Sequence, residues 1–164
     1  MEKKKNILLV DDAPPPSSTL FSALRLLPGC EEILIAPDAL SALKILRRRR
    51  VDIVFVKYNL PGHTGLCFLS LVKSRKRSSE LPVFLFGEKI SEGQNKLAQR
   101  LNAAGCIEAG GDRDALNRGL KSILDPELLP SYVFFTQRNS STLKKFWVTN
   151  TENFGEEMIT GAFF

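Results

Sequence analysis

Four short, continuously apolar runs recur between residues 7 and 86, separated by segments with the periodicity of amphipathic helices. The runs are residues 7–10 (ILLV), 33–36 (ILIA), 53–56 (IVFV) and 83–86 (VFLF), and residues 106–108 form a weaker fifth candidate. Such runs are expected of strands covered on both faces. Five β-α units joined by right-handed crossovers predict a parallel sheet with helices on both faces.

The expected helices have recognisable ends and apolar stripes. Asp38, Thr64 and Ser91 can each cap the start of a helix, whereas the first helix should stop at Pro28-Gly29. The residues expected to face the core are Leu20, Leu24 and Leu27, then Leu40, Leu43 and Leu46, then Leu66, Leu69 and Val72, then Leu97 and Leu101, and finally Leu116, Leu120 and Ile123.

The net charge of +5 is unevenly distributed along a chain whose 164 residues suffice for one core. Residues 1–125 carry 20 Lys and Arg against 14 Asp and Glu, while residues 126–164 carry 3 against 4. Basic residues cluster at 3–5, 47–50 and 73–77, which suits a nucleic-acid footprint. The last two clusters also fall at the ends of expected helices, where cations favour the helix dipole and solvent.

The residues with reactive side chains form no known catalytic or metal-binding motif. Cys30, Cys67 and Cys106 lack the spacing of a disulfide or zinc framework, so we expect a reducing, cytoplasmic compartment. His63 is expected in an exposed loop, and Cys67 is expected to be buried or half-buried on a helix. The basic N-terminus precedes only four apolar residues, too few for a signal peptide or membrane span. We therefore expect no enzyme activity, no metal and no cofactor.

Charged residues and glycines follow the strands at the end of the sheet where ligands of such folds collect. Asp11 and Asp12 come after the first strand, Lys57 after the third, Gly87 after the fourth, and residues 110–112 after the fifth. A cation that directly follows the buried run 53–56 is a local conflict. Such conflicts mark a functional site or the relic of one.

Five stretches, in order, resemble the receiver (CheY-like) domain of two-component response regulators. They are ILLVDD (7–12), APDALSAL (36–43), DIVFVKYNLPGHTGL (52–66), LPVFLF (81–86) and AAGC (103–106). The resemblance implies a doubly wound, flavodoxin-like α/β fold with five parallel strands in the order 2-1-3-4-5. It assigns residues 1–125 to the receiver unit and leaves residues 126–164 as an extension.

In that family an Asp after the third strand accepts phosphate, and acidic residues after the first strand hold Mg²⁺. Here the acidic pair is present as Asp11 and Asp12, but Lys57 stands at the acceptor position. The family's Ser or Thr after the fourth strand falls on Gly87, and its Lys falls on Asp112 by ungapped count. The resemblance thus implies a degenerate pocket, a pseudo-receiver, in which an ammonium group neither forms an acyl phosphate nor binds Mg²⁺.

Several arrangements of Lys57 remain open. Its amine can pair with Asp11 and Asp12, or with Asp112 as an exchanged ion pair, or its stem can extend into solvent without a fixed partner. Asp112 has a competing role as the N-cap of the fifth helix.

Residues 126–164 are rich in aromatics, and we expect them to be ordered as a β-rich extension. The pattern predicts a hairpin from strands at residues 132–136 and 143–149. A third strand is expected at residues 157–164. A ribbon of this size needs a surface to pack on. That surface could be its own receiver unit or a second copy, or the ribbon could be the start of a larger output region. The candidate interaction residues are Tyr132, Phe134, Phe135, Phe146, Trp147, Phe163 and Phe164.

Together these features favour a phosphorylation-independent signalling module that acts through a protein partner or through self-association. The alternative is a nucleic-acid-binding regulator that uses the basic runs 47–50 and 73–77. This alternative lacks interleaved aromatic residues and any recognised nucleic-acid motif.

Overall fold

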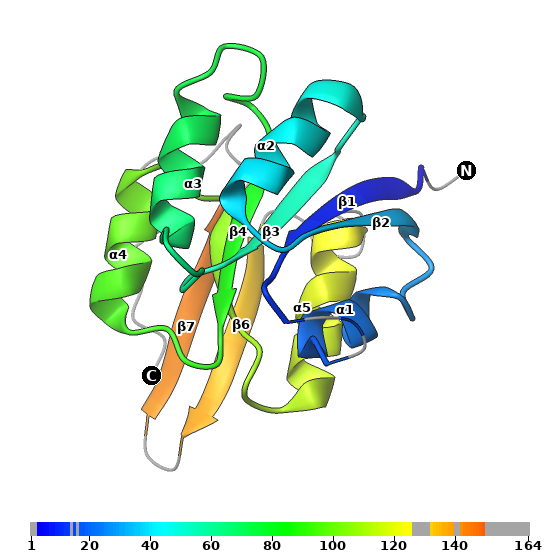
Figure 1. Cartoon of the computed structure of the whole chain (residues 1–164). Coiled ribbons are helices and arrows are strands. Elements are labelled where there is room, and N and C mark those ends of the chain that lie inside the picture. The colour runs from blue at the N-terminus through cyan, green and yellow to red at the C-terminus, as the bar shows by residue number, and fades with distance from the viewer. Residues whose placement is uncertain (1–2, 14, 16, 126–131, 140–141, 150–164) are drawn as a thin grey trace.

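A computed structural model describes the backbone of residues 3–13, 15, 17–125, 132–139 and 142–149, and the side chains of those up to residue 125. Strands and helices alternate along the first 125 residues (Figure 1). The elements are β1 (Lys5–Val10), α1 (Thr19–Leu24), β2 (Cys30–Ala36), α2 (Ala39–Arg48), β3 (Ile53–Lys57), α3 (Gly65–Lys73), β4 (Val83–Gly87), α4 (Glu92–Arg100), β5 (Gly105–Glu108) and α5 (Arg113–Leu124).

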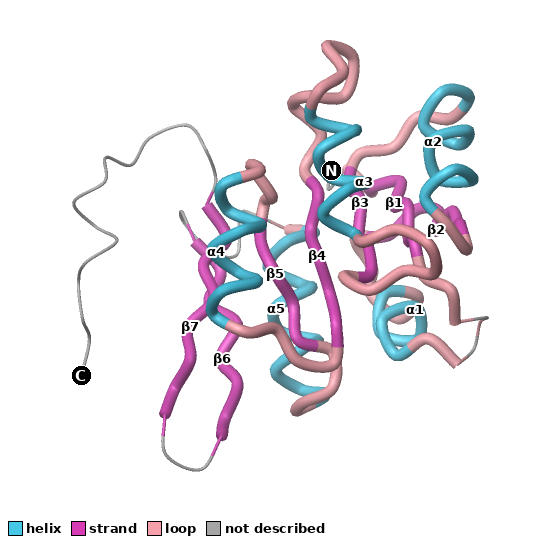
Figure 2. The backbone as a smooth tube through the Cα atoms, turned by 60° about the vertical axis from the view of Figure 1, so that its left-hand side comes forward, coloured by secondary structure: helices cyan, strands magenta, loops and turns pink. Residues whose placement is uncertain are grey.

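These strands form one parallel sheet in the order β2-β1-β3-β4-β5. Helices α1 and α5 cover one face, and α2, α3 and α4 cover the other (Figures 1 and 2). The predicted fold class and strand order are therefore confirmed. The order reverses between β1 and β3, so their carboxyl ends form the crevice where doubly wound folds bind ligands.

The buried strands explain why the sheet holds together. Every residue of β3 except its last is buried, and the rings of Phe55 and Phe84 stack between neighbouring strands with centroids 5.4 Å apart. Burying one such side chain contributes roughly 1.5–3 kcal/mol. The expectation of full burial fails for β2, an edge strand in which Ile33, Leu34 and Ile35 are only half-buried.

The predicted helix starts are confirmed. The side chains of Asp38, Thr64 and Ser91 accept hydrogen bonds from backbone N–H groups three residues on, in α2, α3 and α4. At Ser91 the side chain of Gln94 bonds back to the cap and completes a capping box.

Two of the expected core residues point outward, so their assignment was wrong. Leu40 in α2 and Leu97 in α4 are 63% and 47% exposed. In α2 the small residues Ala39 and Ala42 face the core instead, and in α4 Ala98 does. Small residues let these helices approach the sheet closely, and the leucines beside them are turned outward.

Beyond α5, strands β6 (Tyr132–Asn139) and β7 (Thr142–Thr149) pair antiparallel as a separate two-stranded sheet alongside α5 and β5 (Figure 2). In this register Phe134 lies opposite Trp147, and Phe135 lies opposite Phe146. The expected third strand at 157–164, including Phe163 and Phe164, lies outside the described residues. The use of the aromatic side chains as an interface stays a prediction.

Candidate functional site

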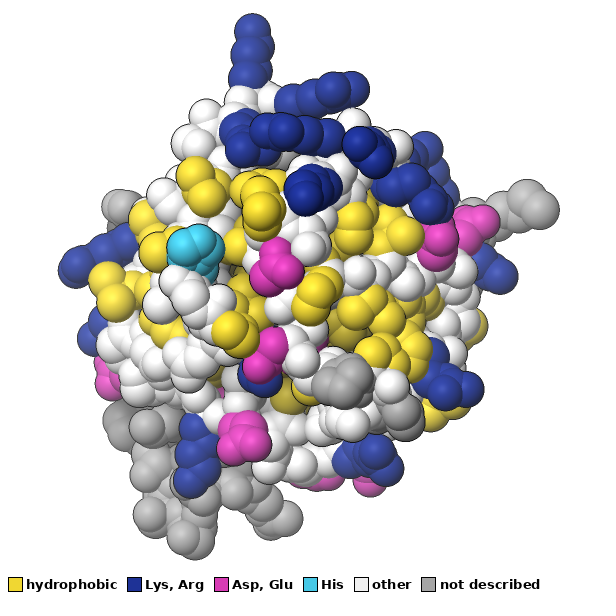
Figure 3. Space-filling view, in the orientation of Figure 1, with side chains coloured by type: hydrophobic (Ala, Val, Ile, Leu, Met, Phe, Trp, Pro, Cys, Tyr) yellow, Lys and Arg dark blue, Asp and Glu magenta, His cyan; other side chains and the backbone are white. Residues whose placement is uncertain are grey.

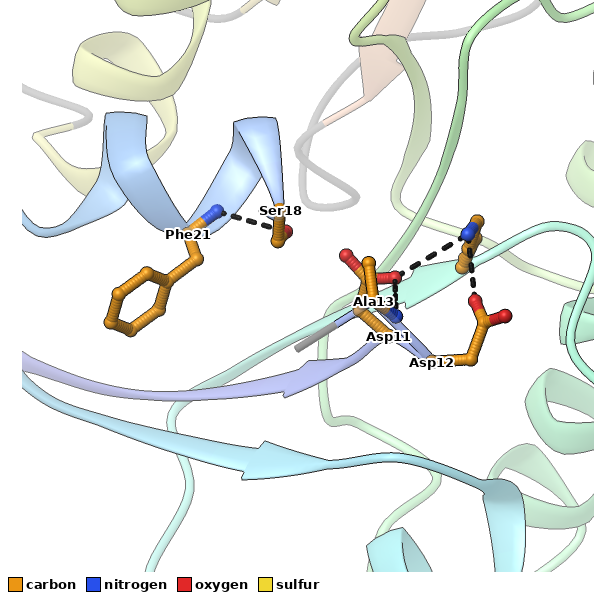
Figure 4. Close-up of polar contacts among 6 residues, drawn as sticks. Asp11, Asp12, Ala13, Ser18 and Phe21 are labelled. Atoms are coloured by element: carbon orange, nitrogen blue, oxygen red, sulfur yellow. Dashed lines mark hydrogen bonds and ion pairs between the residues drawn. The ribbon is translucent and has the colours of Figure 1, made fainter. Parts of the chain in front are cut away.

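The parallel register of β1 and β3 brings the acidic pair and Lys57 together. Val10 lies opposite Val56 in this register, so the residues that follow, Asp11 and Lys57, leave the sheet side by side. Figure 4 shows both carboxylates turned toward the same amine. The convergence expected from the strand ends is thus present in the structure.

Lys57 Nζ donates a 2.7 Å hydrogen bond to Asp12 Oδ1 and lies 3.5 Å from Asp11 Oδ1. The side chain of Asp11 is buried, with 4% exposed, and its Oδ1 also accepts from the N–H of Ala13 at 3.0 Å. One third of the Lys57 side chain is exposed. The amine is therefore fixed over the pocket, which excludes a free extension into solvent.

The pair stabilises its own charged state. The hydrogen bond from Lys57 lowers the pKa of Asp12 below its usual value, and desolvation opposes this only in part. The same bond raises the pKa of Lys57, against the cost of its partial burial. Near neutral pH, Lys57 is therefore an ammonium without a lone pair, and Asp12 is a carboxylate.

Backbone contacts around the β3 end hold Lys57 in place. The N–H of Tyr58 donates to Phe86 O at 2.7 Å, and the N–H of Gly65 donates to Tyr58 O at 2.7 Å. A Cβ added at Gly65 would lie 2.5 Å from Lys57 O, so the start of α3 packs directly on the Lys57 backbone. Glycine at position 65 is thus a geometric requirement of the site.

The ends of β4 and β5 are also fixed by close packing. Gly87 stands at the end of β4 without a hydroxyl group. A Cβ at Gly110 would lie 2.7 Å from Glu88 O, so the two loops touch through their backbones. Glu108 accepts from the Ile90 N–H at 2.8 Å through Oε1, while its buried Oε2 has no hydrogen-bond partner among the described residues. Apart from its place at a strand end, no sequence pattern pointed to this carboxylate.

Asp112 does not pair with Lys57. Its side chain caps α5 by accepting from the Asp114 N–H at 2.9 Å. The exchanged ion pair that we considered is therefore absent, and the competing role as an N-cap is the one observed. Of the five candidate pocket residues, the structure brings Asp11, Asp12 and Lys57 into contact.

His63 lies exposed in the loop before α3, as expected. The expectation of a buried Cys67 was wrong, because this residue is exposed on the first turn of α3, where Thr64 Oγ1 donates to its Sγ at 3.3 Å. The buried side of that turn is filled by Phe68 and Leu69.

The acidic pair does not fit the magnesium ion that the fold implies. Mg²⁺ demands oxygen ligands in near-octahedral geometry. Here the contacting atom beside both carboxylates is an ammonium nitrogen. Within the described part of the chain, no three His, Cys, Asp or Glu side chains gather as metal ligands. Lys57 supplies a fixed positive charge beside the acidic pair.

Comparison with known proteins identifies a matching family and several relatives. The family described as the response regulator receiver domain matches residues 7–121. The chain is 31% identical over 85 residues to chemotaxis protein CheY-3 of Vibrio cholerae, covering 52% of this chain and 65% of that protein. It is 26% identical over 108 residues to a protein-glutamate methylesterase/protein-glutamine glutaminase of Rhodospirillum rubrum, covering 66% of this chain but only 29% of the enzyme.

Solved structures share the fold at low sequence identity. The chemotaxis response regulator CheY4 of Vibrio cholerae superposes with a TM-score of 0.63 at 20% identity, covering 74% of this chain and 99% of that one. The phosphorylated cyanobacterial phytochrome response regulator RcpA gives 0.65 at 22%, covering 85% and 98%. The family match spans well over half of the sequence, and the chain therefore belongs to the response regulator receiver domain family.

Proposed function

We propose that this receiver domain signals without aspartyl phosphorylation, as a pseudo-receiver that acts through protein–protein interaction. The observation that carries the proposal is the 2.7 Å contact between Lys57 Nζ and Asp12 Oδ1 at the end of β3. An acyl phosphate needs a carboxylate oxygen as nucleophile. Lys57 has none, and its raised pKa keeps its nitrogen protonated.

Regulation then has to come from another input. A phosphoryl group shifts a two-state equilibrium only through different interactions with the two states. A pocket closed by its own ammonium has a fixed charge balance, so binding of a partner, abundance or oligomerisation would set its activity. We propose the face formed by α4 and α5, by resemblance to the family, or the aromatic extension as the contact surface. The exposed Leu97 on α4 supports the first of these.

We also propose that the protein is not an enzyme and that it works in the cytoplasm. The methylesterase relative is matched over only 29% of its length, so its activity is not carried over. The three cysteines are unpaired, which supports a reducing compartment. None of the helices in the described residues is long and apolar enough to span a bilayer.

Incubation with acetyl phosphate and Mg²⁺, followed by intact-mass analysis, tests the proposal. We expect no acid-stable or labile adduct of about 80 Da, the mass of one phosphoryl group. A receiver domain with an acceptor Asp, treated in parallel, shows that the donor is active. A labile adduct on Asp11 or Asp12 of this chain would refute phosphorylation independence.

A further inference from the structure

A groove of about 430 Å³ lies between the carboxyl-terminal ends of α2 and α3. Its walls combine the four arginines at 47–50 with Arg75 and Arg77, and aliphatic side chains line it as well. Figure 3 shows these cations gathered at the top of the view with apolar surface between them. Because helices and strands of such a sheet run in opposite directions, the groove and the Lys57 pocket lie at opposite ends of the sheet.

Internal hydrogen bonds hold the groove wall that follows α3. Lys73 Nζ donates to Ser79 O at 3.0 Å and to Leu81 O at 2.8 Å, and Ser78 Oγ donates to Val72 O at 2.7 Å. Burial lowers the pKa of Lys73. Lys73 therefore serves the loop itself, while Arg75 and Arg77 on the same segment face the groove. The loop is ordered before any ligand arrives, which limits the entropy cost of binding.

Most of the positive charge around the groove is uncompensated. Arg49 pairs with Glu32 at 2.6 Å, and Arg50 pairs with Asp52 at 3.3 Å. The remaining four arginines have no carboxylate partner among the described residues. They are Arg47, Arg48, Arg75 and Arg77.

The groove also presents an apolar surface. Leu43, Leu46, Val51 and Leu81 line it between the arginines. Leu46, Val51 and Leu81 are only half-buried, so a ligand with apolar side chains would remove them from water. Among the described residues, no aromatic side chain lines the groove, so a nucleic-acid base would find no stacking platform there.

We infer that this groove binds an acidic peptide segment of a partner protein that carries aliphatic side chains among its carboxylates. The guanidinium groups would form bidentate hydrogen bonds with the carboxylates of the peptide. The leucines between the arginines would pack against its aliphatic side chains. The inference rests on the proposed function only in taking a protein as the partner. A phosphorylation result at Asp11 or Asp12 leaves it untouched, because the groove shares no residue with that pocket.

Fluorescence anisotropy with a labelled peptide of Glu-Glu-Leu repeats tests the inference on the full chain at about 0.15 M salt. A matched peptide with Ser in place of Leu and a single-stranded DNA of equal charge are the comparators. We expect the Leu peptide to bind at least about tenfold more tightly than either one. Equal binding of the Ser peptide, tighter binding of the DNA, or no binding of the Leu peptide would overturn the inference.

Variants locate the binding. The double substitution Arg75→Gln and Arg77→Gln should weaken binding of the Leu peptide by about tenfold or more. Removing two exposed cations elsewhere, Arg25→Gln and Arg100→Gln, should change it by less than about twofold. Circular dichroism and thermal melting verify that each variant is folded. Equal losses of peptide affinity in the two double variants would mean that only net charge matters, and would contradict a specific groove.

Two further measurements exclude other occupants. Replacing Glu152, Glu156 and Glu157 by Gln in the full chain should leave the peptide affinity unchanged. A gain of about tenfold would show that the chain's own acidic segment occupies the groove, and would overturn the assignment to a partner. Light scattering of the wild type and the Arg75 and Arg77 variant should give equal masses. A dimer lost only in the variant would identify a second copy as the occupant.

Discussion

The Nζ atom of Lys57 lies 2.7 Å from Oδ1 of Asp12, although 45 residues separate them in the chain. The contact exists because β1 and β3 are adjacent parallel strands that end at the same level. It is an ion pair at the carboxyl end of the sheet, with Asp11 Oδ1 3.5 Å from the same amine.

Replacing Lys57 with Met should lower the free energy of unfolding by about 1–2 kcal/mol, because Asp11 and Asp12 then lose their shared cation. Urea unfolding at neutral pH measures the change. Lys96→Met removes the exposed pair with Glu92 on α4 and should cost less than about 0.5 kcal/mol. Equal losses in the two variants would mean that the pocket pair contributes no more than a surface ion pair.

The contribution of the Lys57–Asp12 pair should depend on pH with a defined sign. The folded-state pKa of Asp12 lies below the usual 3.8, so its stabilisation is present above about pH 4 and disappears as pH falls through the folded value. The folded-state pKa of Lys57 is raised above its usual 10.5. The stabilisation from its charge is therefore fully present below about pH 10 and is lost as the pH rises through the folded value.

The measurement is the difference in unfolding free energy between wild type and Lys57→Met across pH. It should be level between about pH 5 and 9 and should shrink toward acid. The Asp12→Asn background is the control, because this carboxylate no longer titrates there, and the change in unfolding free energy on adding Lys57→Met to it should lose most of that acid dependence. A difference that grows as pH falls below about 4 would contradict the assigned pair.

The sequence was informative wherever local chemistry decides structure. Continuous apolar runs predicted the strands, and the caps at Asp38, Thr64 and Ser91 predicted the helix starts, because both depend on neighbours in the chain. The meeting of Lys57 with the acidic pair was also predictable, since strand ends in a parallel sheet share one edge.

Tertiary contacts determine the features that the sequence did not predict. A stripe of leucines does not fix the rotation of a helix, so Leu40 and Leu97 face solvent where smaller neighbours fit the sheet. The sequence allowed Asp112 either to pair with Lys57 or to cap α5. In the structure it caps α5, where it accepts from the Asp114 N–H. The role of Glu108, whose Oε2 is buried, was not predictable from local sequence, because the Ile90 N–H that it accepts lies 18 residues away.

The three cysteines should differ in reactivity. Cys67 is exposed and should react rapidly with a water-soluble disulfide reagent under native conditions. Burial raises the pKa of Cys106 to about 12 and also raises the pKa of half-buried Cys30, so both thiolates are scarce at neutral pH. Thiol titration should give one fast equivalent, removed by Cys67→Ser, and the others only after denaturation. Fast labelling of Cys106 in the folded protein would contradict its burial.

Gly65 couples α3 to the pocket, and its substitution should disturb both. In Gly65→Ala the new methyl would lie 2.5 Å from Lys57 O and 2.8 Å from Leu85 Cδ2, so the helix start and the β3 end have to move apart. We expect a loss of about 2 kcal/mol or more in the free energy of unfolding, typical of overpacking a close contact. Gly93→Ala is the matched control, because the new Cβ meets only Ser91 Oγ at 4.0 Å. This substitution should stabilise α4 by about 0.5 kcal/mol.

Because the displaced β3 end carries Lys57, the Gly65→Ala protein should also lose part of the acid-dependent stability that the ion pair supplies. Unchanged stability in Gly65→Ala would show that the α3 start does not press on the Lys57 backbone, and the rigid placement of the amine would need another cause.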